Sequence, residues 1–190
     1  MGVKICLGLP TNRGIKPKTA QSLLEMVLNT PANFHTVVST KGYNTAENRN
    51  YITAQAVKAN CTHLLLLDDD MVYTPDGIND LLKHKKEVIG AKYSVRRFVD
   101  EGINHEVIEY GEEKSDTEIF KCMALGGGLL LIDLSIIPSL KTPLFWYKVH
   151  DIGMVEMSND WWFCERAREA GYDIWCDPNI KLGHIGDYEY

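Results

Sequence analysis

Residues 62–77, THLLLLDDDMVYTPDG, join an apolar run, three consecutive aspartates and the opening of a helix. Leu64 to Leu67 predict a strand that is buried on both faces, as central strands of parallel sheets are. Pro75 then suits the first turn of a helix. Asp68, Asp69 and Asp70 follow the strand at its carboxyl end, which is where open α/β sheets bind their ligands. The stretch therefore predicts an α/β fold with a ligand site beyond this strand.

Strand and helix patterns alternate on both sides of this stretch. Short apolar runs predict further strands over 3–9, 34–40, 87–95, 126–133 and 172–178. Helical patterns, with proline near one start and glycine at one end, predict helices over 18–29, 45–59, 75–86 and 160–171. Strands that alternate with helices favour right-handed βαβ units, so we expect a mostly parallel central sheet flanked by helices. Two segments lack such a pattern: a polar excursion or hairpin is expected over 97–117 and an aromatic-rich loop over 140–157.

Composition is that of an ordinary soluble globular chain. The 190 residues include 20 Lys and Arg against 26 Asp and Glu, a net charge of −6, with 45% hydrophobic and 24% charged residues. No apolar run approaches the roughly 20 residues that span a bilayer, and the start lacks a secretory signal. Five scattered cysteines without a CxxC pair favour reduced thiols. We therefore expect one cytoplasmic domain, 1–190, whose acidic balance disfavours nonspecific nucleic-acid binding.

The three aspartates have a chemical explanation of their own. Adjacent carboxylates repel one another unless a cation lies among them. Mg²⁺ or Mn²⁺, which prefer hard oxygen ligands, would remove that repulsion. Alternation along an extended chain points Asp68 and Asp70 to the same side. The alternative is an acidic turn that caps the next helix, but capping needs one acid, and Thr74 is the nearest candidate. A metal or nucleotide role is therefore expected.

Two blocks and two short segments resemble GT-A glycosyltransferases of the family 2 kind. Residues 44–82 carry a helix with the pair Arg49-Asn50 and then a strand that ends in Asp68-x-Asp70, like the DxD motif of that family. Residues 159–178 resemble the helix that bears the ED motif, with Asn159 where the family often has Glu and with Asp160 kept. The tail 182–186, LGHIG, resembles the segment with a late metal-binding histidine, and the loop 10–13, PTNR, completes the order.

The resemblance implies an α/β GT-A (Rossmann-like) fold and a metal site. Asp70 and His184 would bind Mn²⁺ or Mg²⁺, His184 from a glycine-flanked loop that lets its ring swing toward the metal. Asp68 would face the ribose or the waters of the metal, and Asp69 would lie near the sugar. The metal would neutralise the diphosphate leaving group as negative charge develops on it.

The resemblance also implies contacts to the nucleotide. Arg49 would reach the diphosphate, with Arg13 as a second candidate, because a guanidinium matches phosphate oxygens in a two-pronged way. Taken alone, Arg49 fits a solvated helix arginine equally well. The loop residues expected to contact the base are Pro10, Thr11, Asn12 and Arg13. Proline and asparagine at these positions also fit a simple turn, so the identity of the base stays open.

Asp160 would act as the general base that takes the proton of an acceptor hydroxyl, giving displacement with inversion. An acid in the first turn of a helix also suits the helix dipole. Because position 159 lacks the usual Glu, Glu156 is considered as its substitute. Sugar or acceptor contacts are expected at Gly127, Gly128, Trp161 and Trp162. Paired tryptophans are equally typical of packing, and glycines of a bulge.

The sequence thus predicts a metal-dependent glycosyltransferase that moves a sugar from a nucleotide-sugar, UDP- or GDP-linked, to an acceptor hydroxyl. Residues 1–96 would bind the donor, and residues 97–190 would bind the acceptor and carry catalysis. The acceptor is left open among a glycan, a small molecule and a modified DNA base. Two other classes stay open: a noncatalytic module that binds nucleotide-sugars or carbohydrate, and a sugar nucleotidyltransferase. The segment 7–20 lacks the paired glycines typical of the latter.

Overall fold

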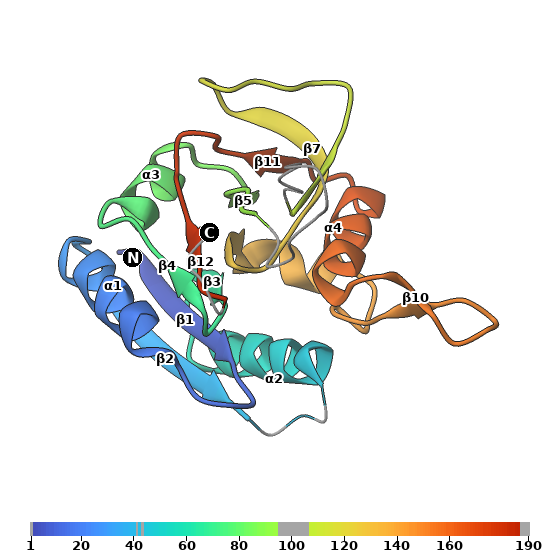
Figure 1. Cartoon of the computed structure of the whole chain (residues 1–190), viewed down its shortest axis with the longest axis horizontal. Coiled ribbons are helices and arrows are strands. Elements are labelled where there is room, and N and C mark those ends of the chain that lie inside the picture. Colours follow the sequence, from blue (N-terminus) through green and yellow to red (C-terminus); the bar gives the residue numbers. More distant parts are fainter. Residues whose placement is uncertain (1, 41, 43, 95–106, 187–190) are drawn as a thin grey trace.

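The computed structural model describes residues 2–40, 42, 44–94 and 107–186. Its centre is an eight-stranded sheet with the order β2-β1-β3-β8-β5-β11-β7-β6 (Figure 1). The strands are β1 (Lys4–Pro10), β2 (Asn33–Ser39), β3 (His63–Leu67), β5 (Val88–Gly90), β6 (Ile108–Tyr110), β7 (Phe120–Leu125), β8 (Leu129–Asp133) and β11 (Ile174–Cys176). The α/β class expected from the sequence is confirmed.

Strand direction is mostly shared across the sheet. β1 pairs in parallel with β2 and β3, and β5 pairs in parallel with β11. The two reversed strands are β8, which lies antiparallel between β3 and β5, and β7, which lies antiparallel between β11 and β6. The sequence gives no sign of this reversal, because β8 is apolar on both faces and hydropathy does not report direction.

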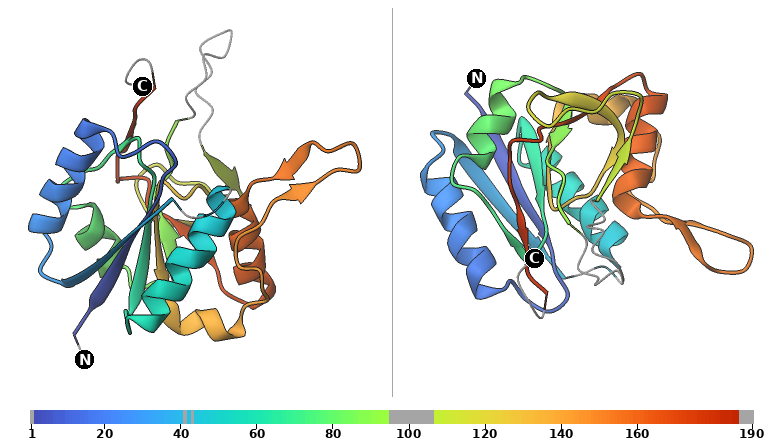
Figure 2. Two further views of the ribbon diagram at one scale, coloured as in Figure 1. Left: turned by 90° about the horizontal axis from the view of Figure 1, so that it is seen from below. Right: turned by 45° about the horizontal axis from the view of Figure 1, so that its top comes forward.

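Two pairs of helices cover the two faces of the sheet (Figure 2). One face carries α1 (Pro17–Leu28) and α3 (Gly77–Lys83), and the other carries α2 (Thr45–Lys58), α4 (Asn159–Glu169) and the short 3-10 helix η1 (Leu134–Ser139). Asn44 caps α2 by accepting a hydrogen bond from the Glu47 amide at 3.0 Å. Gly171, at φ +92°, follows α4 in the left-handed conformation that ends many helices.

The alternation of β3 divides the core into two layers. Leu64 and Leu66 pack among the residues under α2 and α4, whereas Leu65 and Leu67 pack among those under α1 and α3. All four side chains are fully buried. Because both faces of β3 are covered, its position is fixed deep in the molecule, and the aspartates that follow it leave the sheet at one defined edge.

Three segments differ from the sequence expectations. The segment 140–157 is more than a loop: β9 (Lys148–Val149) and β10 (Val155–Met157) form a hairpin that projects from the body (Figures 1 and 2). Within the expected excursion, β6 is an edge strand of the main sheet, and 97–106 lies outside the described residues. The segment around His184, expected as a glycine-flanked loop, contains the short strand β12 (Gly183–His184), which pairs with β4 (Met71–Val72).

All five cysteines are buried, and none of them forms a disulfide bond within the described part of the chain. Within the ranges that the structure describes, we find no helix with the length and apolar character needed to cross a bilayer.

Candidate active site

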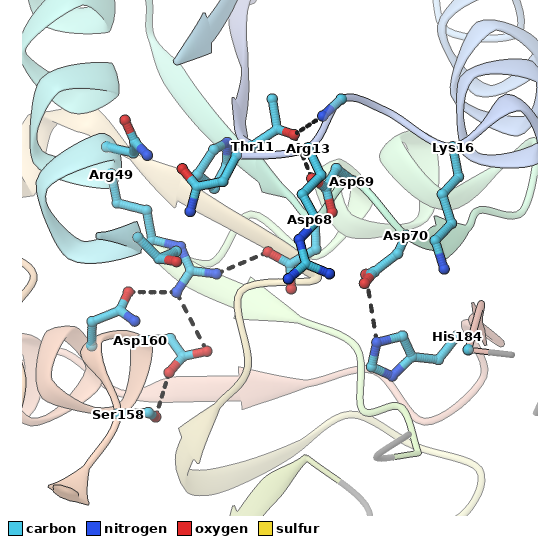
Figure 3. Close-up of a pocket in the computed structure, with 17 residues that line it drawn as sticks. Thr11, Arg13, Lys16, Arg49, Asp68, Asp69, Asp70, Ser158, Asp160 and His184 are labelled. Atoms are coloured by element: carbon cyan, nitrogen blue, oxygen red, sulfur yellow. Dashed lines mark hydrogen bonds and ion pairs between the residues drawn. The ribbon is translucent and has the colours of Figure 1, made fainter. Parts of the chain in front are cut away.

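A cleft of about 970 Å³ opens beyond the carboxyl ends of β1 and β3, between the N-terminal ends of α2 and α4 (Figure 3). Most residues singled out in the sequence line it, although they lie far apart along the chain. The lining is formed by Pro10, Thr11, Asn12, Arg13, Gly14, Lys16, Thr45, Asn48, Arg49, Asp68, Asp69, Asp70, Ser158, Asn159, Asp160, His184 and Gly186. Only the sheet and its crossover helices bring these segments together.

Asp70 and His184 face each other at one side of the cleft, with His184 Nε2 3.5 Å from Asp70 Oδ1 (Figure 3). His184 Nδ1 lies 2.8 Å from the carbonyl oxygen of Ser94, a geometry in which Nδ1–H donates to that oxygen. A neutral ring in this tautomer would present the lone pair of Nε2 toward the Asp70 carboxylate. The Tyr93 ring packs edge-on against the imidazole at 5.4 Å. Contrary to the expected swinging loop, β12 and these contacts hold the ring in place.

The Asp70–His184 pair would suit the divalent cation expected from the sequence. With a neutral His184 in this tautomer, Nε2 and Asp70 Oδ1, which lie 3.5 Å apart, would both offer lone pairs to a shared ion. Among the described residues, no group of three or more His, Cys, Asp or Glu side chains could hold a metal ion by itself. Mg²⁺ and related ions accept such sparse protein ligation, because substrate phosphates and water complete their shells.

Arg49 lies across the floor of the cleft and joins β3 to α4. Its guanidinium donates from Nη2 to Asp68 Oδ1 at 3.0 Å and from Nη1 to Asn159 Oδ1 at 2.7 Å, and Nη1 lies 3.4 Å from Asp160 Oδ2. The side chain is only 3% exposed. Arg49 is therefore not a solvated helix residue. Asn159 accepts a hydrogen bond from Arg49 without bringing the additional negative charge that a Glu at this position would bring.

Asp160 accepts hydrogen bonds on both carboxylate oxygens. Oδ1 accepts from the Ser158 hydroxyl and from the Trp161 amide at 3.1 Å, and Oδ2 accepts from the Gly127 amide at 3.0 Å. A Cβ at Gly127 would collide with the Arg49 guanidinium, so glycine is what allows this close approach. Glu156, by contrast, pairs with Lys148 on the projecting hairpin at 2.6 Å and does not line the cleft.

Burial and charge set the pKa values of these groups in opposite directions. Burial raises the pKa of Asp68, and Arg49 offsets this only in part. Burial also acts to raise the pKa of Asp160, but Arg49 and the hydrogen bonds from Ser158 and Gly127 outweigh it and hold that pKa below its ordinary value. The two carboxylates raise the pKa of Arg49 despite its burial. Asp160 is therefore ionised at neutral pH beside the Arg49 cation.

The loop after β1 forms the upper wall of the cleft in Figure 3. The Thr11 hydroxyl donates to Asp69 Oδ2 and accepts from the Gly14 amide at 2.9 Å. Arg13 is exposed at the cleft and forms no hydrogen bond or ion pair with any described residue. Lys16, which the sequence analysis missed, donates from Nζ to the Ile185 carbonyl at 2.6 Å and brings a second cation to this wall.

All four residues expected to contact sugar or acceptor lie outside the lining of the cleft. Trp161 packs against the core, and Trp162 donates from Nε1 to the Pro143 carbonyl at 3.1 Å beneath the Arg166 guanidinium. A Cβ at Gly128 would meet the Tyr93 ring. Gly127 acts on the cleft indirectly, because its backbone amide donates a hydrogen bond to Asp160, which lines the cleft. Asn48 and Ser158 line the cleft and were missed, because nothing in the local pattern marks them.

Comparisons with known proteins bear on the fold. No protein-family model matches the sequence, and no relative is found among curated proteins. A197 from STIV superposes with a TM-score of 0.66 at 12% identity over 97% of this chain and 86% of that chain. GalNAc-T7, in a crystal structure with UDP, GalNAc and Mn²⁺, superposes with a TM-score of 0.60 at 12% identity over 97% of this chain and 44% of that chain.

The chain thus spans less than half the length of GalNAc-T7. Similarity at this identity reports the fold and not the activity. The mixed sheet and its two helical layers are those of a GT-A-like fold.

Proposed function

We propose that the protein is a metal-dependent glycosyltransferase that moves a sugar from a nucleotide-sugar donor to an acceptor hydroxyl with inversion. Residues 1–96 would bind the donor, and residues 97–190 would bind the acceptor and supply the base. The observation that carries the proposal is one cleft with the Asp70–His184 pair, which would bind the cation, on one side and a buried carboxylate, Asp160, on the other. The crystal structure of GalNAc-T7 with UDP and Mn²⁺ supports the class of donor and cofactor.

Asp70 and His184 would hold Mn²⁺ or Mg²⁺, which as a Lewis acid stabilises the charge that develops on the leaving diphosphate. Arg13 and Lys16 would bind the diphosphate oxygens, Lys16 from beside the Asp70–His184 pair, because its Nζ donates to the carbonyl of Ile185. Arg13 suits this function better than Arg49, whose Nη1 and Nη2 already bind protein oxygens. The donor contacts proposed for Pro10, Thr11 and Asn12 rest on their place in the same wall.

Asp160 would accept the proton of the acceptor hydroxyl as that oxygen attacks the anomeric carbon. The bond from the anomeric carbon to the diphosphate oxygen then breaks. The Ser158 hydroxyl supports this function, because it already donates to Oδ1 from a residue that lines the cleft. An acceptor hydroxyl would take over that lone pair. The lowered pKa keeps Asp160 ionised, as a base must be, at neutral pH.

The test is a thermal-shift panel of UDP-, GDP-, CMP- and dTDP-sugars, each with Mn²⁺, Mg²⁺ or EDTA. A ligand that binds only the folded state stabilises it by about 2.7 kcal/mol at a hundredfold excess over its Kd. We expect stabilisation by one donor class that EDTA abolishes and that Asp70→Ala removes. The absence of any metal-dependent shift across the panel would contradict the proposal.

A noncatalytic nucleotide-sugar-binding protein is the second candidate. One observation favours it: both oxygens of Asp160 are occupied by protein donors, which weakens the carboxylate as a base. Donor binding without release of nucleoside diphosphate, with either water or a hydroxyl-rich acceptor library, would select this candidate over the transferase.

A further inference from the structure

Asn48 has a buried side-chain amide whose oxygen forms hydrogen bonds with the protein and whose nitrogen forms none with the described residues. The residue lies on α2, is 1% exposed and lines the cleft. Its Oδ1 accepts from the Ser39 hydroxyl at 2.8 Å and from the Gly42 amide at 2.9 Å. The Gly42 N–H can only donate, so it fixes which atom of the amide is oxygen and which is nitrogen.

The Asn48 Nδ2 group has no hydrogen-bond partner in the described part of the chain. A buried donor without an acceptor is costly, and such groups in native proteins call for an explanation. Isoleucine or leucine would remove this unpaired donor only by leaving the Ser39 hydroxyl and the Gly42 amide without their acceptor. An acceptor supplied by a ligand in the cleft would explain why an amide stands here.

The position of Asn48 indicates which part of a donor would reach it. Ser39 joins Asn48 to the loop after β1, because the Ser39 carbonyl accepts from the Thr11 amide at 3.0 Å. In Figure 3 Thr11 lies apart from both the Asp70–His184 pair and Asp160. A donor with its diphosphate at the metal pair and its sugar toward Asp160 would extend its nucleoside toward this corner.

We propose that Asn48 Nδ2 donates a hydrogen bond to a keto oxygen of the nucleotide base and so selects the donor. The ligand class is a nucleoside diphosphate whose base has a keto group where cytosine and adenine have an amino group, as in uracil O4 or guanine O6. The inference rests on the proposed function, which states only that a nucleotide-sugar binds. An amino group at that position would meet the Nδ2 donor with a donor of its own.

The experiment measures the affinities of UDP, CDP, GDP and ADP by calorimetry in the presence of Mn²⁺. For wild type we expect UDP to bind about tenfold more tightly than CDP, or GDP than ADP, which is the discrimination one matched hydrogen bond gives. Asn48→Asp keeps the acceptor for Ser39 and Gly42 and replaces the orphan donor by an acceptor. The affinity ratio should then fall about tenfold or reverse in favour of the amino base.

Two further variants guard against a folding defect. Asn48→Ala removes the amide, and its keto-to-amino affinity ratio should approach one. Gln55→Glu makes the same amide-to-carboxylate change on α2 away from the cleft lining and should keep the wild-type ratio. Because the readout is a ratio within one variant, a uniform loss of folded protein does not alter it.

The outcomes separate the two proposals. If no nucleoside diphosphate binds wild type with metal present, the proposed function is wrong, and the inference on Asn48 is wrong as well. If nucleotides bind but the keto-to-amino ratio is near one in wild type, or is unchanged in both Asn48→Asp and Asn48→Ala, the inference on Asn48 is wrong while the proposed function stands.

Discussion

At the scale of single residues, the site depends on the contacts of one buried cation, the guanidinium of Arg49. Arg49 binds Asp68, Asn159 and Asp160 at once, so it holds acids from two distant segments in fixed positions. A guanidinium can do this because its donors form a rigid planar fork, whereas an ammonium is a point charge on a flexible stem. The sequence alone marked Arg49 as important but not for this reason.

Arg49→Ala should lower the free energy of unfolding by about 3 kcal/mol, because it leaves the buried carboxylate of Asp160 and the partly buried carboxylate of Asp68 without their cation. Arg49→Lys should recover only part of that loss, since it keeps the charge but not the fork. Urea denaturation at pH 7 measures both. Arg13→Lys is the matched control: Arg13 is exposed and forms no hydrogen bond or ion pair with a described residue, so we expect a change in stability below about 0.5 kcal/mol. Equal effects at the two arginines would contradict the bridging function of Arg49.

Asp160→Asn should leave donor binding within about twofold of wild type while abolishing transfer, because the amide keeps the shape of the carboxylate but cannot take a proton. Glu156→Gln should leave transfer unchanged, since Glu156 pairs with Lys148 away from the cleft. Release of nucleoside diphosphate with acceptor present is the readout. Substantial transfer by Asp160→Asn, or its loss in Glu156→Gln, would reassign the base.

At the scale of elements, the ends of strands and helices are tied by polar groups that periodicity does not reveal. Asp177 follows β11, is 1% exposed and binds His84 Nε2 at 2.9 Å just beyond α3. It also accepts from the Asn179 amide at 2.9 Å. Burial acts to raise the pKa of Asp177, but these hydrogen bonds outweigh it and lower that pKa.

A carboxyl group with a lowered folded-state pKa stabilises the fold above its unfolded pKa, near 4, and loses that contribution as the pH falls through the folded value. Asp177→Asn should therefore be less stable than wild type at pH 7. The difference should shrink progressively below about pH 4. Urea melts of both proteins at pH 7, 5, 4 and 3 check this. A difference that stays constant over that range would mean that the charge of Asp177 contributes nothing.

At the scale of the whole molecule, the two halves predicted to divide the function form one sheet. β8, from the second half, lies between β3 and β5 of the first half. A fragment of residues 1–96 would thus expose both apolar edges that β8 covers. We expect this fragment to lack cooperative unfolding in circular dichroism, and a coexpressed fragment of residues 97–190 to restore it. Cooperative folding of residues 1–96 alone would show that the donor half is independent.

The sequence by itself determined the α/β class, the strand that ends in the aspartates and most of the residues that meet in the cleft. These features are readable because burial imposes periodicity and because the acid follows an apolar run directly. Only the tertiary structure decided the reversal of β8, the fixed ring of His184, the bridging by Arg49 and the orphan amide of Asn48. Each of these depends on partners 6 to 110 residues away or on strand direction, and neither can be read from the local pattern of the sequence.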